Sequence, residues 1–268
     1  MFSKHCVIVK GGGDLATAVA HKLFRVGFHV VITELEKPMM VRRKVSFANC
    51  IYESEWTVEG ITSVMTDAEG MDRVLKDGKI PVLIDPTCNI SKQIQPSIII
   101  DAILAKRNLG TQLKDAPVVI GLGPGFIAGE DVNAVIETKR GHNLGRIIFC
   151  GAAEPNTGVP GDIKGYTTQR ILRSPCEGIV ENQVEIGSVV KQGDIICAVN
   201  GEEVNAQIDG IVRGLIATNS NVSLGEKIGD VDPRSDVEYC TTISDKGRSI
   251  AGGVLEAVMI LLEDSKCK

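Results

Sequence analysis

The stretch from Val7 to Thr17, read as VIVKGGGDLAT, constrains the fold of this chain more than any other. A short apolar strand enters a Gly-x-Gly-x-x-Ala turn, and a helical pattern over Leu15–Arg25 follows. Gly11 permits the tight turn, Gly13 lets backbone N–H groups approach a pyrophosphate, and Ala16 allows close packing of helix and strand. The amino end of such a helix also carries partial positive charge, so the stretch predicts a site for a phosphate-bearing ligand.

An acidic residue stands where a nucleotide ribose is expected. The second apolar run, Phe28–Thr33, ends at Glu34, about 20 residues past the turn, where a carboxylate can accept a hydrogen bond from a ribose 2′-OH. Glu34 favours NAD over NADP, although Arg42 and Arg43 weaken that preference. The alternative is a purely structural turn. The predicted cofactor-binding residues are Gly11, Gly12, Gly13, Asp14, Leu15, Ala16, Glu34 and, at a later strand end, Asp85.

Composition excludes several classes of protein. The net charge of −5 argues against binding to nucleic acid or to an anionic membrane surface. The eight cysteines form no Cys-x-x-Cys pair, so no metal site is expected and a reducing, cytoplasmic compartment is indicated. No secretory signal is visible, and the apolar stretch Val254–Leu262 is far too short to span a membrane.

Residues 1–160 alternate between strand and helix patterns, which predicts a Rossmann-like domain with a mostly parallel sheet. The expected strands are Cys6–Val9, Phe28–Thr33, Gly60–Met65, Ile80–Ile84, Ile98–Ile103, Val118–Leu122, Ala134–Thr138 and Arg146–Cys150. The expected helices are Leu15–Arg25, Met40–Ala48, Ala68–Lys76 and, near the end of the chain, Ile250–Glu263. A Gly- and Pro-rich linker over 151–161 marks a boundary, and residues 233–268 are expected to pack on the first domain.

An internal repeat lies between these parts. Gly178-Ile179-Val180 recurs 32 residues later as Gly210-Ile211-Val212, and each half continues with a Val-x-x-Gly-Asp/Glu turn and an apolar strand. The repeat predicts a small sandwich with pseudo-twofold symmetry over 165–232, similar to the biotinyl/lipoyl carrier fold, a barrel-sandwich hybrid. The expected hairpin at Asn200-Gly201 carries no lysine, so no covalent biotin or lipoate is expected. The predicted class is therefore α/β, followed by an all-β domain and a C-terminal helix.

A second anion or substrate site is the other chemical prediction. A Gly-rich turn follows the strand at Val118, and Glu137–Arg146 is dense in groups that hold anions or exchange protons. Structural turns and a solvated hairpin are the alternatives, and a buried Asp101 needs a partner, for which Lys106 and Arg107 are candidates. Cys88 and Cys150 are expected to be buried free cysteines. The second-site residues are Gly121, Gly123, Gly125, Glu137, Arg140, His142, Arg146, Asp101, Lys106, Asp245 and Lys246.

Six segments together resemble one family. They are Val9–Thr17, Asp101–Thr111, Gly121–Phe126, Ile136–Arg146, Ser244–Lys246 and Ala251–Glu256. They resemble the accessory protein family of selenium-dependent molybdenum hydroxylase systems. The resemblance implies a cytoplasmic maturation factor that acts with a molybdenum hydroxylase subunit and binds NAD or a molybdopterin-type nucleotide.

Two other functions stay open at this point. The turn and Glu34 are compatible with an NAD-dependent oxidoreductase, although no Tyr-x-x-x-Lys set is present. The repeat region is compatible with a non-catalytic interaction module on a Rossmann scaffold. A small-molecule nucleotide is the expected ligand, no catalytic residue is assigned, and a homo-oligomer is left open.

Overall fold

The computed structural model describes residues 5–264, which divide into two compact units. The first comprises residues 5–38, 46–157 and 243–264, and the second comprises Met39–Val45 and Gly158–Thr242. The chain thus enters the second unit briefly at residue 39, returns to the first, and crosses again after Thr157.

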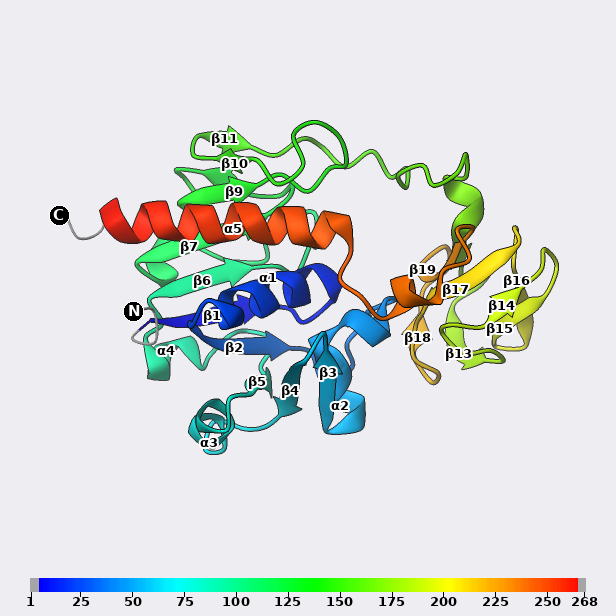
Figure 1. The fold of residues 1–268 in the computed structure, drawn as a ribbon, viewed down its shortest axis with the longest axis horizontal. Helices are drawn as coiled ribbons and strands as arrows, with labels where there is room; N and C mark the ends of the chain where they lie inside the picture. The colour runs from blue at the N-terminus through cyan, green and yellow to red at the C-terminus, as the bar shows by residue number, and fades with distance from the viewer. Residues whose placement is uncertain (1–4, 265–268) are drawn as a thin grey trace. The chain divides into compact units, whose positions relative to one another are not determined.

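A nine-stranded, mostly parallel sheet forms the first unit, in the order β10-β9-β7-β6-β1-β2-β5-β4-β3 (Figure 1). Its parallel strands are β1 (Cys6–Lys10), β2 (His29–Glu34), β4 (Ile61–Met65), β5 (Ile80–Ile84), β6 (Ile98–Asp101), β7 (Val118–Leu122) and β9 (Ala134–Ile136). Antiparallel strands close both edges: β3 (Glu55–Val58) pairs with β4, and β10 (Ile147–Ile148) pairs with β9. β6 and β7 are buried along their whole length, and β1 is buried over Val7–Val9, which explains the apolar stretches at these positions of the sequence.

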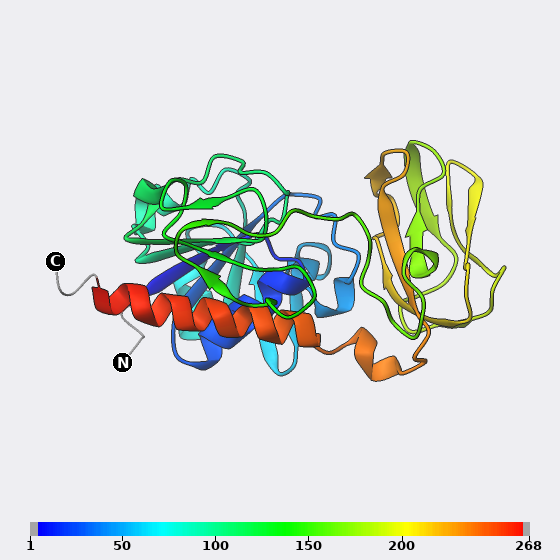
Figure 2. The ribbon, with the colours of Figure 1, turned by 90° about the horizontal axis from the view of Figure 1, so that it is seen from above.

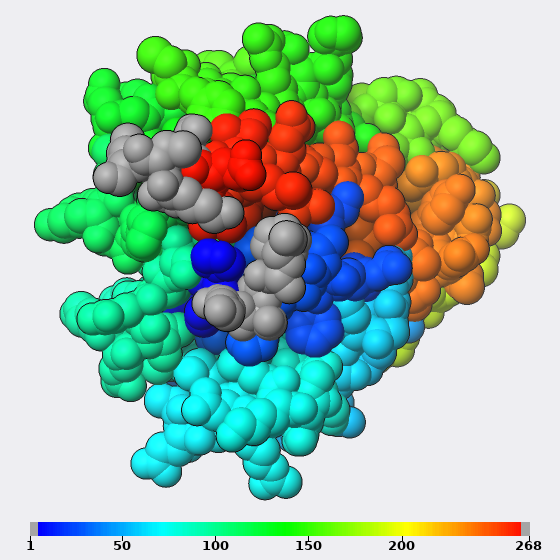
Figure 3. Space-filling model, turned by 60° about the vertical axis from the view of Figure 1, so that its left-hand side comes forward, coloured from blue at the N-terminus to red at the C-terminus, as the bar shows by residue number. Residues whose placement is uncertain are grey.

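Two long helices lie side by side on one face of this sheet, α1 (Asp14–Arg25) and α5 (Asp245–Asp264) (Figures 1 and 2). Figure 3 shows the surface of α5, in red, running between α1 in blue and a green segment. The small antiparallel sheet of β8 (Ile127–Ala128) and β11 (Gly151–Ala152) contributes Ala128 to the same core cluster as Phe126 and Val135. The other face is covered by short elements, among them α3 (Met71–Lys76) and α4 (Ser91–Ile94), and by irregular chain that buries Phe126 and Val132.

Tight packing of α5 accounts for the glycines near its start. A Cβ on Gly253 would strike the carbonyl oxygen of Gly145, and a Cβ on Gly145 would lie 2.7 Å from the carbonyl oxygen of Ser249. Glycine in a helix costs about 1 kcal/mol relative to alanine. The close approach of α5 to the turn before β10 explains why the sequence has glycine at this position of the helix despite that cost.

Most expected elements are present with shifted ends, and one is wrong. Strands over Ile80–Ile84 and Val118–Leu122 have the expected bounds. Met40–Ala48 was expected to be a helix, but it holds two 3₁₀ turns, Arg43–Val45 and Phe47–Asn49, before the one-turn α2 (Cys50–Glu53). Its first residues belong to the second unit, whose contacts override the helical pattern.

The second unit consists of two four-stranded antiparallel sheets, β12-β19-β17-β14 and β16-β15-β13-β18. The strands of the first are β12 (Ile171–Arg173), β19 (Lys227–Asp232), β17 (Gly210–Leu215) and β14 (Val189–Val190). The strands of the second are β16 (Glu202–Asn205), β15 (Ile195–Val199), β13 (Gly178–Asn182) and β18 (Asn221–Val222).

The internal repeat is confirmed by the strand register. Val190 of the first repeat pairs with Gly210 of the second. The equivalent residues, 32 positions apart, pair in the same way, because Val222 of the second repeat pairs with Gly178 of the first. Each repeat therefore lends one short strand to the sheet of the other. The Asn200-Gly201 turn is confirmed as well, because both residues have positive φ (48° and 85°) and they join the paired residues Val199 and Glu202.

The predicted fold class needs correction. The structure is a mixed α/β fold with a large, mostly parallel sheet plus separate antiparallel sheets, and a Rossmann-like domain followed by a barrel-sandwich domain is wrong as its description. A doubly wound domain carries crossover helices on both faces. Here the connection from β6 to β7 holds only a 3₁₀ turn, Leu113–Asp115, and β7 reaches β9 through β8 alone. In addition, the all-β part is not one continuous segment, because it includes Met39–Val45.

None of the helices that the structure describes has the length and apolar character needed to cross a membrane.

Burial of His21 in α1 should make the stability of the protein depend on pH. Its Nε2–H donates to the carbonyl of Glu59 at 3.3 Å, and burial lowers the pKa of the ring below its ordinary value of about 6.5. The folded state therefore prefers neutral His21, so this stabilisation is present above about pH 6.5 and is lost as the pH falls toward the folded pKa. We expect urea unfolding at pH 7.5 and 5.5 to show a smaller acid loss for His21→Gln than for the wild type. The exposed His29→Gln serves as control, and an equal loss in all three proteins would contradict the assignment.

Candidate functional site

The candidate site lies at the carboxyl edge of the parallel strands of the first unit. Polar or glycine residues stand at or just past six strand ends: Lys10, Glu34, Asp85, Asp101, Gly123 and Glu137. β2 lies on one side of β1 and β6 on the other, so the winding of the chain reverses at β1. Open α/β sheets bind ligands outside the carboxyl ends of the strands at such a reversal.

The glycine turn after β1 is shaped by its neighbours. Gly11 has φ +92° and donates its N–H to the carbonyl of Thr33 at 2.8 Å. A Cβ on Gly11 would lie 3.1 Å from the carbonyl oxygen of Ala102, which is a tight contact. A Cβ on Gly12 would lie 2.8 Å from the Cβ of Ala48. Gly13 differs from both, because a Cβ there meets nothing within 4 Å. Close packing of neighbouring chain therefore explains why Gly11 and Gly12 are glycines, whereas Gly13 faces open space.

Glu34 holds the turn in place. One carboxylate oxygen accepts the N–H of Gly12 at 2.8 Å, and the other accepts the N–H of Leu35 at 2.8 Å. Burial raises the pKa of the Glu34 carboxyl, and the two N–H donors offset part of that rise. Each carboxylate oxygen has a second lone-pair site, so hydrogen bonding to a ribose hydroxyl stays a prediction.

The amino end of α1 carries unsatisfied backbone donors. Among the residues that the structure describes, the N–H groups of Gly13, Leu15 and Ala16 have no hydrogen-bond partner. Leu15 and Ala16 are buried, and Gly13, the residue before the helix, makes no side-chain cap. Buried N–H groups normally have a partner, so these donors at a helix amino end suit an anion or water.

Asp85 has a structural role in the described chain. Its carboxylate accepts the N–H of Ile90 at 2.8 Å, and its own N–H donates to the carbonyl of Glu34 at 3.0 Å. The side chain thereby closes the turn that follows β5, and its predicted part in cofactor binding is not tested by this geometry.

A buried ion pair spans the switch point. Lys10 lies opposite Asp101 in the register of β1 and β6, and its Nζ is 3.2 Å from the Asp101 carboxylate. Thr111 accepts a hydrogen bond from Lys10 and donates one to Asp101, both at 2.5 Å. The partners expected for Asp101 were Lys106 and Arg107, and this expectation is wrong: both are exposed, and Lys106 has a left-handed backbone with φ 61°.

The second glycine turn, after β7, packs against protein. A Cβ on Gly121 would lie 2.5 Å from the Phe126 ring, and one on Gly125 would lie 2.6 Å from the backbone nitrogen of Arg107. Gly123, with φ +75°, sits equally close to Thr138. These contacts account for all three glycines structurally.

The remaining second-site residues do not converge on one point. Arg140 makes a bidentate pair with Asp245, at 2.6 and 2.9 Å, while Glu137 and Arg146 line a separate hollow. His142 is exposed, and Lys246 is half-buried in the first turn of α5.

Of the two cysteines that were expected to be buried, Cys88 and Cys150, only Cys88 is buried. Cys88 is buried, and burial raises the pKa of its thiol, whereas Cys150 is exposed and was wrongly expected to be buried. Within residues 5–264, no group of three or more His, Cys, Asp or Glu side chains is placed to hold a metal ion.

Sequence reasoning missed Lys10, Thr111, Asn143 and Glu154 as parts of these sites. A lysine at the end of an otherwise apolar strand was the one available signal, because such a charge needs a partner at the same sheet edge.

Comparison with known proteins gives one clear sequence relative. The chain is 48% identical over 258 residues to the Escherichia coli K12 protein YqeB, which is described as uncharacterized. The match covers 96% of this chain and 48% of YqeB, so the chain spans about half the length of that relative. No family model matches.

Solved structures give weak likenesses. The ectoine utilization protein EutE (DoeB) from Ruegeria pomeroyi matches with a TM-score of 0.26 and 11% identity, over 85% of this chain and 84% of that chain. An aspartoacylase family protein from Mesorhizobium loti matches with a TM-score of 0.26 and 14% identity, over the same shares. TM-scores this low transfer neither fold nor activity.

The family expected from the sequence is corrected by these comparisons. No family model matches the chain, and the sequence relative YqeB is described only as uncharacterized, so neither supports the accessory protein family. The resemblance is withdrawn, together with the maturation role and the selenium and molybdenum hydroxylase assignment. The alternatives of an NAD-dependent oxidoreductase and an interaction module are withdrawn with it. The hydroxylase partner and the nucleotide ligand stay predictions.

Proposed function

We propose that the first unit binds a phosphate-bearing small molecule of nucleotide type at the switch point between β1 and β6. The observation that carries the proposal is the group of unpartnered N–H donors of Gly13, Leu15 and Ala16 at the amino end of α1. A phosphate supplies acceptors for these donors and is favoured by the partial positive charge of the helix end.

The surroundings support a nucleotide rather than phosphate alone. Glu34 lies beside the turn with acceptor capacity left for a sugar hydroxyl, and Gly13 offers open space in front of the helix. NAD and a molybdopterin-type nucleotide are the ligands to test first, together with mass spectrometry of any molecule released from the purified protein on denaturation. A ligand at 100 times its dissociation constant stabilises a protein by about 2.7 kcal/mol, which thermal unfolding detects readily.

Two substitutions at Gly13 separate binding from folding. Its φ of −68° and ψ of −178° suit a residue that caps a helix, and nothing obstructs a side chain there, so Gly13→Asp and Gly13→Asn should both fold stably. The two side chains are nearly isosteric and differ in charge. We expect the thermal shift produced by the nucleotide to vanish in Gly13→Asp and to persist in part in Gly13→Asn.

The proposal fails on either of two results. One is a wild-type protein that carries no ligand and shows no shift with either nucleotide. The other is a Gly13→Asp variant that binds the nucleotide as tightly as the wild type does.

A further inference from the structure

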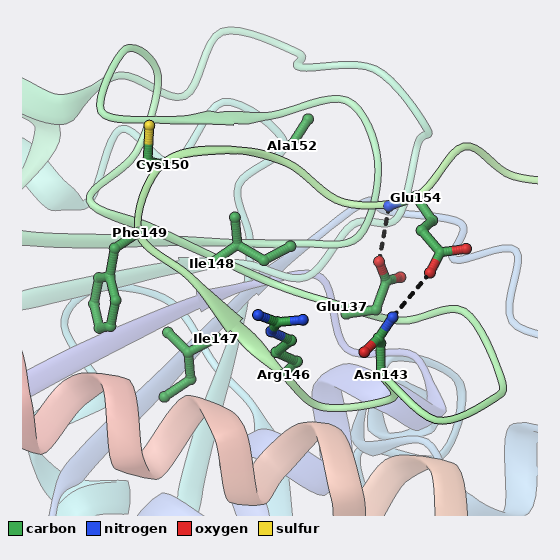
Figure 4. A pocket seen from close by; sticks show the side chains of 9 residues that line it. All are labelled: Glu137, Asn143, Arg146, Ile147, Ile148, Phe149, Cys150, Ala152 and Glu154. Atoms are coloured by element: carbon green, nitrogen blue, oxygen red, sulfur yellow. Dashed lines mark hydrogen bonds between the residues drawn. The ribbon is translucent and has the colours of Figure 1, made fainter.

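A second hollow in the first unit lies away from the glycine turn, beside the edge strand β10 (Figure 4). Its volume is about 360 Å³, and its lining includes Glu137, Asn143, Arg146, Ile147, Phe149 and Glu154. β10 pairs with β9 alone, so this is the outer edge of the sheet. Four strand spacings of about 4.8 Å separate β10 from β1, which places the hollow roughly 19 Å from the nucleotide site proposed above.

The acidic side chains of the hollow already have partners in its wall. Glu137 is buried, and its two oxygens accept the backbone N–H groups of Lys139 at 2.7 Å and Glu154 at 2.8 Å. The Glu154 carboxylate pairs with the Lys139 ammonium at 2.6 Å and accepts a hydrogen bond from Asn143 at 3.2 Å. These bonds hold both carboxylates in place and satisfy oxygens that would otherwise attract a cation.

Arg146 is different, because its guanidinium makes no ion pair or hydrogen bond with any residue that the structure describes. In the view of Figure 4 its side chain lies between Glu137 and Asn143 on one side and Ile147 on the other. A guanidinium offers a planar fork of donors that matches a carboxylate or phosphate in two parallel hydrogen bonds. Arg146 is solvent-exposed, so its guanidinium is available to an anion that enters the hollow.

An apolar surface continues from this cation. Ile147 is half-buried, and Phe149, which is 46% exposed, lies at the same side of the hollow. Small-molecule sites combine such apolar walls with a few placed polar groups, and they occupy about 300–1,000 Å³. We propose that this hollow binds a small organic anion, with a carboxylate or phosphate on Arg146 and a flat apolar body against Ile147 and Phe149.

Amide chemical-shift titrations of the whole chain with phenyl phosphate and with benzoate test the proposal. We expect saturable shifts within residues 137–154 for at least one probe, and the probe that binds more tightly identifies the preferred anionic group. Arg146→Gln should weaken that binding about tenfold or more. The matched control is Arg140→Gln on the same connection, whose guanidinium is already paired with Asp245, and it should change the affinity less than twofold.

A second pair of measurements tests the apolar wall. Phe149→Ala should weaken phenyl phosphate but leave inorganic phosphate unchanged, because only the former reaches the ring. Equal effects of Arg146→Gln and Arg140→Gln would overturn the proposal, as would the absence of any saturable shift in 137–154. Shifts confined to residues 11–16 would also overturn it, while leaving the nucleotide site of α1 supported.

Discussion

Replacing Gly125 with alanine should lower the free energy of unfolding by about 3 kcal/mol, as measured by urea denaturation. Gly125 has φ +113°, which an alanine adopts only at a cost, and its Cβ would lie 2.6 Å from the nitrogen and 2.7 Å from the Cα of Arg107. Because these neighbours are backbone atoms, the clash is relieved only by moving the segment after β6. That segment also packs on Gly11, so the substitution should disturb the nucleotide site as well.

Gly129→Ala is the control that separates conformational strain from collision. Gly129 has φ +91°, but a Cβ there meets nothing within 4 Å. We expect it to cost about 1 kcal/mol, which is the left-handed strain alone. If Gly125→Ala and Gly129→Ala destabilise the protein equally, the close approach to Arg107 contributes nothing.

Local patterns in the sequence are sufficient for strands that are buried over most or all of their length. Ile80–Ile84 and Val118–Leu122 are continuous apolar runs between polar turns, and the structure gives them as strands with those bounds. The 32-residue repeat likewise predicted symmetric pairing, because matched residues of two similar halves make matched contacts.

Contacts from distant parts of the chain explain the failed helix at Met40–Ala48. Leu215 donates its N–H to the carbonyl of Val41 at 2.8 Å, and Arg43 donates to the carbonyl of Leu215 at 2.8 Å. Arg42 similarly reaches the carbonyl of Tyr239, also at 2.8 Å. Partners more than 170 residues away leave no trace in the local spacing of apolar residues, and that spacing alone predicts a helix.

The parts of the candidate site that are consecutive in the chain could be predicted from the sequence. The parts that meet only through strand pairing could not. Strand, glycine turn and helix follow one another between Cys6 and Arg25, so the turn could be located from the sequence. The partner of Asp101 could not, because Lys10 is 91 residues earlier and meets it only through the pairing of β1 with β6. Lys106 and Arg107 are close to Asp101 in the sequence, but both are exposed, and Lys10 holds the carboxylate instead.

Removing the Asp101 carboxylate should be the most damaging change at the switch point. The side chains of Lys10 and Asp101 are 12% and 3% exposed, so Asp101→Ala leaves a nearly buried ammonium without its counter-charge and Thr111 without its acceptor. Breaking a buried pair in this way costs about 3–5 kcal/mol, and the partial exposure of Lys10 favours the lower end of that range. Urea unfolding of the variant should therefore show a loss of about 3 kcal/mol.

The double variant Lys10→Met/Asp101→Ala shows whether the loss comes from the unpaired charge. Removing the ammonium as well eliminates the buried charge, so the double variant should be no less stable than Asp101→Ala alone. Asp101 and Thr111 are also the two ends of the segment 102–110, which packs on both glycine turns. Both variants should therefore weaken nucleotide binding, although only the single variant is strongly destabilised. Strictly additive losses from the two single substitutions would show that Lys10 and Asp101 do not stabilise each other.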